Sequence, residues 1–221
     1  MQPRVEKLEK LLKLSNNNDD FRVLGIWGMG GVGKTTHATV LYGRISYQFN
    51  ARSFIDNVSK IYKDGGAVAV QKQILRQALD EKNLDTYDTC EIAGIMVNRF
   101  HSGIKVLLVL DNVDQLEQLQ DLAINPKFLC KGSRIIATTR DEHILRVYGT
   151  DKIHEVPLLN NKDARELLCR KAFHKDDQSS SYVELIPEVL RYAQHLPLAI
   201  KVVGSFLCTR DTVHWRDTLD R

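Results

Sequence analysis

The feature that most constrains this chain is a glycine-rich stretch at residues 28–35, which reads GMGGVGKT and matches the pattern G-x-x-x-x-G-K-[ST] in full. A β-type apolar run, Val23–Trp27, precedes the stretch, and a helical run, Thr36–Ile45, follows it. A loop of this kind turns consecutive backbone N–H groups toward phosphate oxygens, and the following helix adds the positive end of its dipole. The context predicts a nucleotide-binding phosphate loop, against the alternative of a turn that merely tolerates glycine.

The loop residues have distinct expected roles in holding a nucleotide. Lys34 is expected to reach the β- and γ-phosphates as a mobile cation, and the Thr35 hydroxyl is expected to ligate Mg²⁺. The expected ligands are therefore ADP or ATP together with Mg²⁺. The loop residues predicted to contact the nucleotide are Gly28, Gly30, Gly31, Val32, Gly33, Lys34, Thr35 and Thr36.

A second apolar run, residues 105–110, ends in an acid, Asp111. A buried parallel strand delivers the residue at its C-terminal end to the ligand crevice of an open α/β sheet. Asp111 is therefore predicted to hold Mg²⁺ through water, as a Walker B acid does. An acidic cap at the start of the next helix would look the same in the sequence.

The residue after this acid is an amide, Asn112, where many P-loop ATPases have a carboxylate that activates the attacking water. An amide can orient water but cannot accept its proton at neutral pH. Asp114 is near enough in the sequence to substitute, although a helix cap is the simpler explanation for it. We expect slow or negligible ATP hydrolysis, a weak ATPase at most, with Lys34, Asp111 and Asn112 nearest the reaction.

A third apolar run ends at Arg140, on the sheet edge that is expected to carry Asp111. An arginine at this edge can bind a γ-phosphate through its forked guanidinium and report whether that phosphate is present. A surface ion pair with Asp141 or Glu142 explains the same sequence equally well.

The hydrophobic pattern of the sequence changes near residues 156–157. Up to about residue 156, β-rich apolar runs alternate with amphipathic helical stretches, the pattern of βαβ units around a parallel sheet; after residue 157 the periodicity is helical. We expect an α/β fold: a three-layer P-loop core with a mostly parallel sheet, followed by a small all-helical subdomain. The expected divisions are a helix and linker at 1–20, the nucleotide-binding core at 21–157 and the helical subdomain at 158–221. The runs expected as strands are Val23–Trp27, Ser53–Val58, Lys105–Leu110, Arg134–Thr138 and Ile153–Val156.

Composition argues against several other classes of protein. The longest apolar runs cover five residues, far short of the ~20 that a bilayer crossing needs, and the first residues carry no signal-peptide core. The net charge of +3 is spread along the chain and gives no basic surface for nucleic acid. Four widely separated cysteines indicate neither a zinc site nor a disulfide framework, and they fit a reducing compartment.

Together these motifs resemble the NB-ARC module of plant intracellular immune receptors, within the STAND class of P-loop ATPases. Residues 25–36, GIWGMGGVGKTT, are similar to the family's phosphate loop, and residues 132–140 to its sensor strand, which favours the γ-phosphate role for Arg140. LPLA at residues 196–199 resembles the motif G-L-P-L-A, whose proline, here Pro197, lies near the adenine and sugar. Residues 155–173 resemble the entry into the first ARC helical bundle, and Asp114 resembles the branch that carries an N-terminal TIR domain.

The resemblance implies a molecular switch, in which ADP holds the helical subdomains against the core and exchange for ATP releases them. It also implies a cytoplasmic, or cytoplasmic and nuclear, receptor with TIR and leucine-rich-repeat domains that self-associates and signals in defence. Those domains have no counterpart in residues 1–221, so this chain is expected to be a partial module, with part of one ARC bundle.

Other positions besides Asn112 depart from the family pattern. His37 replaces a leucine of the phosphate-loop helix, and His195 replaces the glycine before Leu196; both are interpreted as packing histidines. Two alternative functions stay open. One is a P-loop ATPase with genuine turnover, and the other is a scaffold that has lost nucleotide binding because its adenine site is truncated.

Overall fold

The computed structural model describes residues 2–12, 22–80, 84, 87, 89–101, 103–122, 129–173 and 180–219. The chain divides into two compact units. The sheet unit consists of Met1–Gly28 with Lys34–Glu155, and the helical unit consists of Met29–Gly33 with Val156–Arg221. The expected combination of an α/β part and a helical part is confirmed. The linker expected near residues 15–20 lies outside the described residues.

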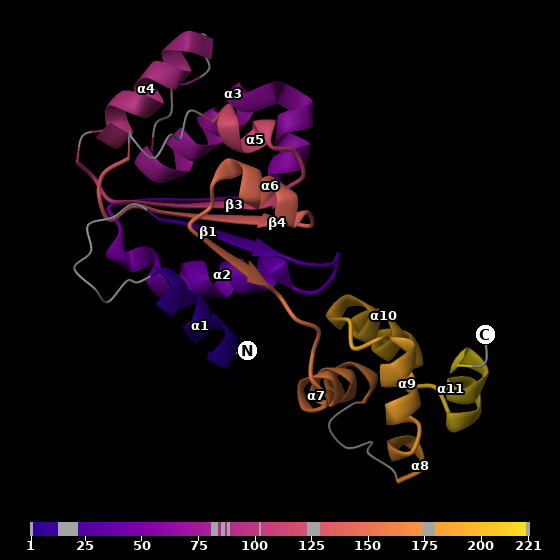
Figure 1. Ribbon diagram of the computed structural model, residues 1–221. Helices are drawn as coiled ribbons and strands as arrows, with labels where there is room; N and C mark the ends of the chain where they lie inside the picture. Colours follow the sequence, from indigo (N-terminus) through magenta and orange to yellow (C-terminus); the bar gives the residue numbers. More distant parts are fainter. Residues whose placement is uncertain are drawn as a thin grey trace. The chain divides into compact units, whose positions relative to one another are not determined.

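Five parallel strands form the sheet in the order β2-β3-β4-β1-β5 (Figure 1). The strands are β1 (Arg22–Trp27), β2 (Ala51–Ile55), β3 (Val106–Val113), β4 (Arg134–Thr139) and β5 (Lys152–Glu155). The inner strands β3 and β4 are buried along almost their whole length, which explains why both read as apolar runs without alternation. Since all strands are parallel, the residues that follow them meet at one edge, and the end of β4 lies between those of β1 and β3.

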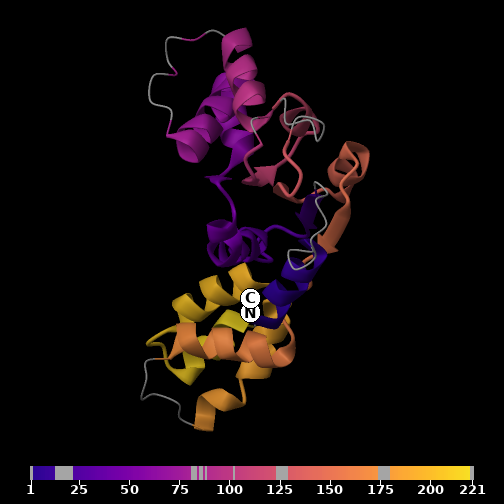
Figure 2. The same ribbon diagram turned by 90° about the vertical axis from the view of Figure 1, so that its left-hand side faces the viewer.

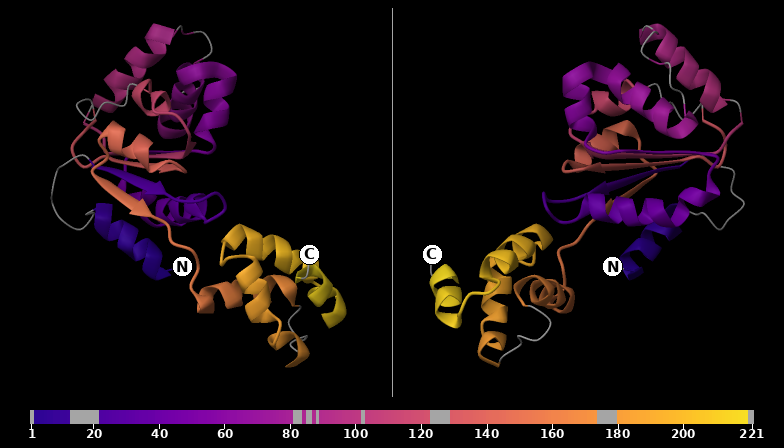
Figure 3. Two further views of the ribbon diagram at one scale, coloured as in Figure 1. Left: turned by 45° about the vertical axis from the view of Figure 1, so that its right-hand side comes forward. Right: turned by 180° about the vertical axis from the view of Figure 1, so that it is seen from behind.

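Helices cover both faces of this sheet. On one face lie α1 (Gln2–Leu12) and α2 (Lys34–Ile45), which ends in the single 3-10 turn η1 (Ser46–Gln48) (Figure 1). The other face is covered by α3 (Val58–Leu79), α4 (Thr89–His101), α5 (Glu117–Gln120) and α6 (Glu142–Tyr148). Helix α4 packs beside α3 (Figure 2), and the views in Figure 3 show the sheet enclosed between the two helical layers. None of the described helices is both long and apolar enough to cross a bilayer.

Two details of the sheet unit differ from the sequence-based expectation. The run Ser53–Val58 is not one strand, because β2 stops at Ile55 and Asn57 takes a left-handed backbone conformation (φ +53) before α3 begins at Val58. Helix α6 was not expected, because seven residues give too little periodicity to detect. Capping residues define both ends of this helix. At the N-terminus the Asp141 side chain accepts a hydrogen bond from the His143 amide at 2.8 Å, and at the C-terminus Gly149 takes a left-handed conformation with a φ of +81°.

In the described part of the helical unit, five helices pack around one apolar core. They are α7 (Asn161–Ala172), α8 (Ser180–Val183), α9 (Ile186–Tyr192), α10 (Pro197–Leu207) and α11 (Thr212–Leu219). Helix α7 begins after Asn160, whose side-chain oxygen accepts from the Asp163 amide at 2.8 Å. Trp215 is fully buried and stacks on Phe173 with ring centroids 5.5 Å apart, while Tyr182 meets its ring at 5.1 Å. This aromatic cluster joins α11 to the end of α7 and to α8.

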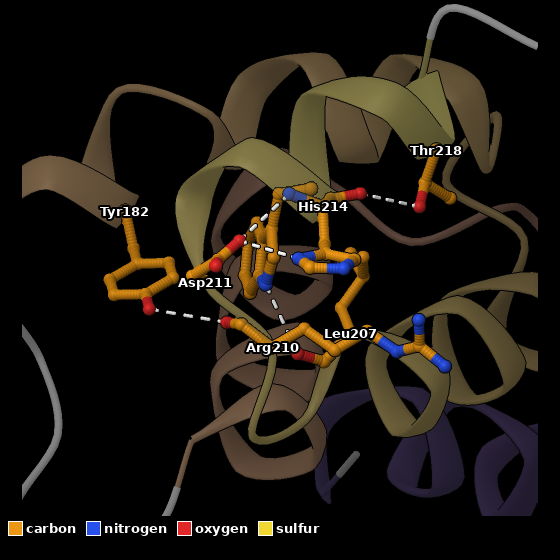
Figure 4. A network of polar contacts seen from close by, with 7 residues as sticks. Tyr182, Leu207, Arg210, Asp211, His214 and Thr218 are labelled. Atoms are coloured by element: carbon orange, nitrogen blue, oxygen red, sulfur yellow. Dashed lines mark hydrogen bonds and ion pairs between the residues drawn. The ribbon is translucent and has the colours of Figure 1, made fainter.

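The start of α11 is held by a set of polar contacts (Figure 4). An Asp211 carboxylate oxygen accepts from the His214 amide at 2.9 Å and lies 2.7 Å from the His214 ring nitrogen Nδ1. Trp215 donates its indole N–H to the Leu207 carbonyl at 3.0 Å, so the one polar atom of this buried side chain is paired. The hydrogen bond from the His214 amide is the main cause that lowers the pKa of Asp211.

Candidate phosphate-binding site

The glycine-rich loop connects the end of β1 to the first turn of α2. Gly31 and Gly33 have φ values of +80° and +101°, a backbone region that strains any residue with a side chain. The Val32 amide donates to the Met29 carbonyl at 3.3 Å and tightens the turn. Because α2 begins at Lys34, the amides of its first turn lack intrahelical carbonyl partners, the arrangement that binds anions at a helix N-terminus.

Lys34 is almost buried at the start of α2, with 9% of its surface exposed. Its ammonium Nζ donates to the Gly28 carbonyl at 2.8 Å. Burial is the main cause that lowers the pKa of Lys34, the positive charge of Arg140 lowers it further, and the negative charge of Asp111 opposes both. These couplings place three of the predicted site residues in one electrostatic neighbourhood.

Asp111 lies in β3 with 3% of its surface exposed and is contacted by two hydroxyls. The Thr35 Oγ1 lies 2.9 Å and 3.0 Å from its two carboxylate oxygens, and Thr138 of β4 donates to Oδ1 at 2.7 Å. Burial raises the pKa of Asp111, the hydrogen bonds from Thr138 and Thr35 lower it in part, and the charge of Asp56 adds to the rise. A carboxylate beside a threonine hydroxyl fits the all-oxygen ligand set of Mg²⁺.

Asn112 occupies an irregular position directly after Asp111. The pairing of β3 with β4 shifts register between Leu110 and Val113, and Asn112 has a φ of +57°. Its backbone amide donates to Thr138 Oγ1 at 2.9 Å, and its side-chain Nδ2 donates to Asn57 Oδ1 at 2.8 Å. Bulges and positive φ values at non-glycine residues cluster at functional sites, where they re-aim side chains.

The Asp114 carboxylate makes structural contacts rather than facing Asp111. Ser59 of α3 donates to Oδ2 at 2.6 Å, and the Gln118 side chain donates to Oδ1 at 2.5 Å. Burial alone would raise the pKa of Asp114, but the hydrogen bonds from Ser59 and Gln118 outweigh it and lower the pKa. Asp114 ties the end of β3 to α3 and α5. It is not the N-cap of α5, a position that Leu116 holds.

Arg140 directly follows β4 and is exposed, and its charge acts on Lys34. The two acids that could have formed a surface pair with it have other roles. Asp141 caps α6 through the His143 amide, and Glu142 forms an ion pair with Arg146 at 2.6 Å. Thr36, in the first turn of α2, is exposed as well.

Pro197 lies in the helical unit, at the first position of α10, where the missing N–H costs no hydrogen bond. Within the same unit, the next amide, Leu198, donates to the Gly31 carbonyl at 3.2 Å. His195, before this motif, has a φ of +57°, a left-handed conformation that glycine adopts without strain.

The two histidines differ in burial. His195 is half-buried, and its Nε2 lies 2.7 Å from the Asn161 side-chain oxygen. His37 is buried in α2, as a packing histidine would be.

Sequence reasoning missed three residues that contact or adjoin Asp111 and Asn112. They are Asp56, Asn57 and Thr138. A signal for the first two was present, because the tripeptide Asp-Asn-Val occurs at 56–58 and again at 111–113, each time directly after an apolar run. The Thr138 signal was weaker, since threonine is common in strands for reasons unrelated to function.

Comparison with known proteins identifies the family. The model of the NB-ARC domain matches residues 2–178. The disease resistance protein RPV1 of Vitis rotundifolia is 36% identical over 213 residues, which cover 96% of this chain and 15% of that protein. The disease resistance protein RPP5 of Arabidopsis thaliana is 34% identical over 223 residues, covering 100% of this chain and 15% of that protein. The chain thus spans about 15% of the length of these two relatives.

Solved structures share the fold at low sequence identity. A chain in the structure of Drosophila ORC bound to DNA has a TM-score of 0.68 and 15% identity, with 99% of this chain and 60% of that chain covered. Cdc6p from Pyrobaculum aerophilum has a TM-score of 0.65 and 14% identity, with 91% and 59% covered. These likenesses concern the fold alone. The match to the domain model and the identity to the plant resistance proteins show that the chain belongs to the NB-ARC domain family.

Proposed function

We propose that this chain is the ADP- and ATP-binding switch module of a plant disease-resistance receptor of the TIR-bearing branch, acting in defence signalling. The observation that carries the proposal is the contact between Thr35 and Asp111 of β3, in which the Thr35 hydroxyl lies within hydrogen-bond distance of both carboxylate oxygens. The negative charge of Asp111 also raises the pKa of the neighbouring Lys34. A strand-to-helix turn that merely tolerated glycine would need no such buried carboxylate.

Each residue has a role in this proposal. The loop amides and the N-terminus of α2 bind the β-phosphate, and Lys34 reaches the β- and γ-phosphates as a cation. Thr35 and Asp111 hold Mg²⁺, which neutralises phosphate charge when bound. Arg140 binds the γ-phosphate, and Pro197 of the helical unit lies beside the adenine and sugar in the bound state.

Hydrolysis at this site is proposed to be slow, so that the ATP state lasts. Asn112 has no carboxylate, and its amide donates to Asn57. Asp114 is engaged by Ser59 and Gln118. Neither Asn112 nor Asp114 therefore offers a ready base for the attacking water. The genuine-turnover alternative requires a base from another element.

The switch itself is proposed to act through the helical unit, which changes its association with the sheet unit when ADP is exchanged for ATP. In a full-length receptor the proposed partners are TIR and leucine-rich-repeat domains, with self-association on activation. The proposed location is the cytoplasm, or the cytoplasm and nucleus. No direct contact with nucleic acid is proposed, because the net charge of +3 gives no basic surface.

The test is to purify the chain, release its bound nucleotide and identify that nucleotide by mass spectrometry. Wild type is expected to retain ADP or ATP and Lys34→Ala to lose it, because the buried cation is removed. Lys60→Ala removes an exposed lysine of α3 and serves as the matched control, with nucleotide retained. Turnover of added ATP is expected on the order of 10⁻³ s⁻¹ or below, as in P-loop switches without a supplied catalytic group.

Equal nucleotide in wild type and Lys34→Ala would contradict the site assignment. No nucleotide in wild type, even after incubation with ATP and Mg²⁺, would favour the nucleotide-dead scaffold. Turnover of several molecules per second would favour the ATPase alternative over the switch.

A further inference from the structure

The two Asp-Asn-Val segments lie side by side in the fold, although 52 residues separate them in the sequence. Ile55, the last residue of β2, pairs in register with Leu110 of β3, and the strands are parallel. Asp56 and Asp111 therefore follow at neighbouring positions of the same sheet edge. The electrostatic coupling between the two carboxylates agrees, since the Asp56 charge contributes to the raised pKa of Asp111.

The two asparagines fix this arrangement. Asn57 and Asn112 both have left-handed backbone conformations, with φ values of +53° and +57°, and their side-chain amides are hydrogen-bonded at 2.8 Å. Asn57 precedes α3 but does not cap it with its side chain, because its Oδ1 accepts from Asn112 instead. Two strained residues joined by one hydrogen bond hold the turn after β2 against the end of β3.

Asp56 differs from the other two carboxylates considered at this edge, because their oxygens are already contacted by other side chains. The Asp111 oxygens are contacted by Thr35 and Thr138, and those of Asp114 by Ser59 and Gln118. Asp56 is exposed, and among the residues that the structure describes none forms a hydrogen bond or ion pair with its side chain. Water can therefore reach its oxygens, next to the acid that is proposed to hold Mg²⁺.

We propose that Asp56, directly after the strand beside that of Asp111, is the general base for ATP hydrolysis at this site, where Asn112 has no carboxylate. The inference rests on the proposed nucleotide-binding function and adds the residue that hydrolysis uses. A water molecule gives a proton to the Asp56 carboxylate while its oxygen forms a bond to the γ-phosphorus. The bond from the γ-phosphorus to the β,γ-bridging oxygen breaks, and its electron pair leaves with ADP. The products are ADP and inorganic phosphate, and Asp56 returns the proton to solvent.

The exposure of Asp56 also accounts for a slow reaction. A base on an exposed turn is solvated and held less rigidly than a base packed beside the phosphate loop, so less of the barrier is removed by orientation. Hydrolysis is then slow and depends on the Asp56 carboxylate. A slow rate is what a switch with a long-lived ATP state requires.

The test compares Asp56→Asn with the matched control Asp114→Asn, which changes the other carboxylate considered for this role. Single-turnover hydrolysis of prebound ATP with Mg²⁺ is expected to fall by about 10²-fold in Asp56→Asn, the size of general-base effects, and to stay within about twofold in Asp114→Asn. Affinity for ADP, measured by calorimetry, is expected to be unchanged in Asp56→Asn.

A second readout needs no nucleotide. In the nucleotide-free chain, carboxyl ¹³C titration of Asp111 is expected to show a lower pKa in Asp56→Asn than in wild type, because the charge that raises it has been removed. Asp114→Asn is expected to leave that pKa in place.

Two results would overturn the role of Asp56 and leave the proposed function standing. One is a wild-type hydrolysis rate in Asp56→Asn. The other is a wild type that binds ADP but shows no measurable hydrolysis. A wild type that binds no nucleotide overturns both. An Asp111 pKa that does not change in Asp56→Asn overturns the placement of the two carboxylates.

Discussion

The carboxyl edge of the sheet and the core of the helical unit use buried groups in opposite ways. At the edge, Lys34 and Asp111 are almost buried charges, and Asn57 and Asn112 are held in strained backbone conformations. In the helical unit the fully buried Trp215 is packed among rings and has its single polar atom paired. Buried charge lowers stability at the edge, as expected of the site proposed there for a charged ligand, whereas the aromatic core of the helical unit is stabilised by packing.

The pKa directions express the same contrast. Burial lowers the pKa of Lys34 and raises that of Asp111, so the fold disfavours both charges as they stand in the chain. The Asp211 carboxylate at the start of α11 has a lowered pKa, because hydrogen bonds favour its charged form. Burial therefore disfavours charge at the sheet edge, whereas hydrogen bonds favour the charge of Asp211 in the helical unit.

The largest expected effect tests the helical core. Trp215→Ala removes a fully buried ring that contacts Phe173 and Tyr182, and leaves the Leu207 carbonyl without its donor. We expect the unfolding free energy of the helical unit to fall by about 3–5 kcal/mol, as for other buried Trp→Ala changes. Urea unfolding followed by circular dichroism measures the change.

Tyr192→Ala is the control for that experiment, because it removes an aromatic side chain that is 53% exposed on α9 of the same unit. Its expected cost is within about 0.5 kcal/mol. Similar costs for both variants would mean that the aromatic cluster does not stabilise the unit, and the comparison between the two regions would fail.

An intermediate effect is expected at the sheet edge. Thr138→Val keeps the shape of the side chain but removes the hydroxyl that donates to Asp111 and accepts from the Asn112 amide. Leaving these groups without their partner is expected to cost about 1–3 kcal/mol. The pKa of Asp111 is expected to rise further, because the Thr138 hydrogen bond lowers it. Urea unfolding and carboxyl ¹³C titration measure the two effects.

Thr139→Val on the same strand is the control. The Thr139 hydroxyl accepts a hydrogen bond from the Asp141 amide at 3.1 Å, whereas the threonines that contact Asp111 among the described residues are Thr35 and Thr138. It is expected to cost less and to leave the pKa of Asp111 unchanged. Equal pKa changes in both variants would contradict the assigned role of Thr138.

The smallest effect concerns the cap of α11, where Asp211 is exposed and solvent screens its charge. Its folded-state pKa lies below the unfolded value, so its contribution is present above the unfolded pKa of ~3.9 and is lost as the pH falls through the folded value. The stability difference between wild type and Asp211→Ala is therefore expected to be small at pH 7 and to shrink on acidification. Urea unfolding across that pH range measures it, and a difference that grows toward low pH would contradict the assignment.

Particular elements show how far the sequence could be interpreted. The strand–loop–helix around Lys34 was predictable because glycines at fixed spacing, a lysine and a threonine together have few structural uses. The strand ending in Asp111 was predictable because a two-face-buried parallel strand is apolar throughout. The true end of β2 was not, because Asp56 and Asn57 interrupt an apolar run that continues into Val58. Helix α6 was not predictable from hydrophobic periodicity, because the helix is short and its ends are defined by the residues that cap it.

The sequence by itself determined the phosphate loop, the alternation of strands and helices and the family, because these depend on local spacing and on the periodicity of burial. Only the tertiary structure decided which side chains meet Asp111. It brought Asp56 and Asn57 beside Asp111 and Asn112 from a strand 50 residues away, and it engaged Asp114 with Ser59 and Gln118 instead. Strand order and register are set by packing across the whole sheet, and no local pattern encodes them.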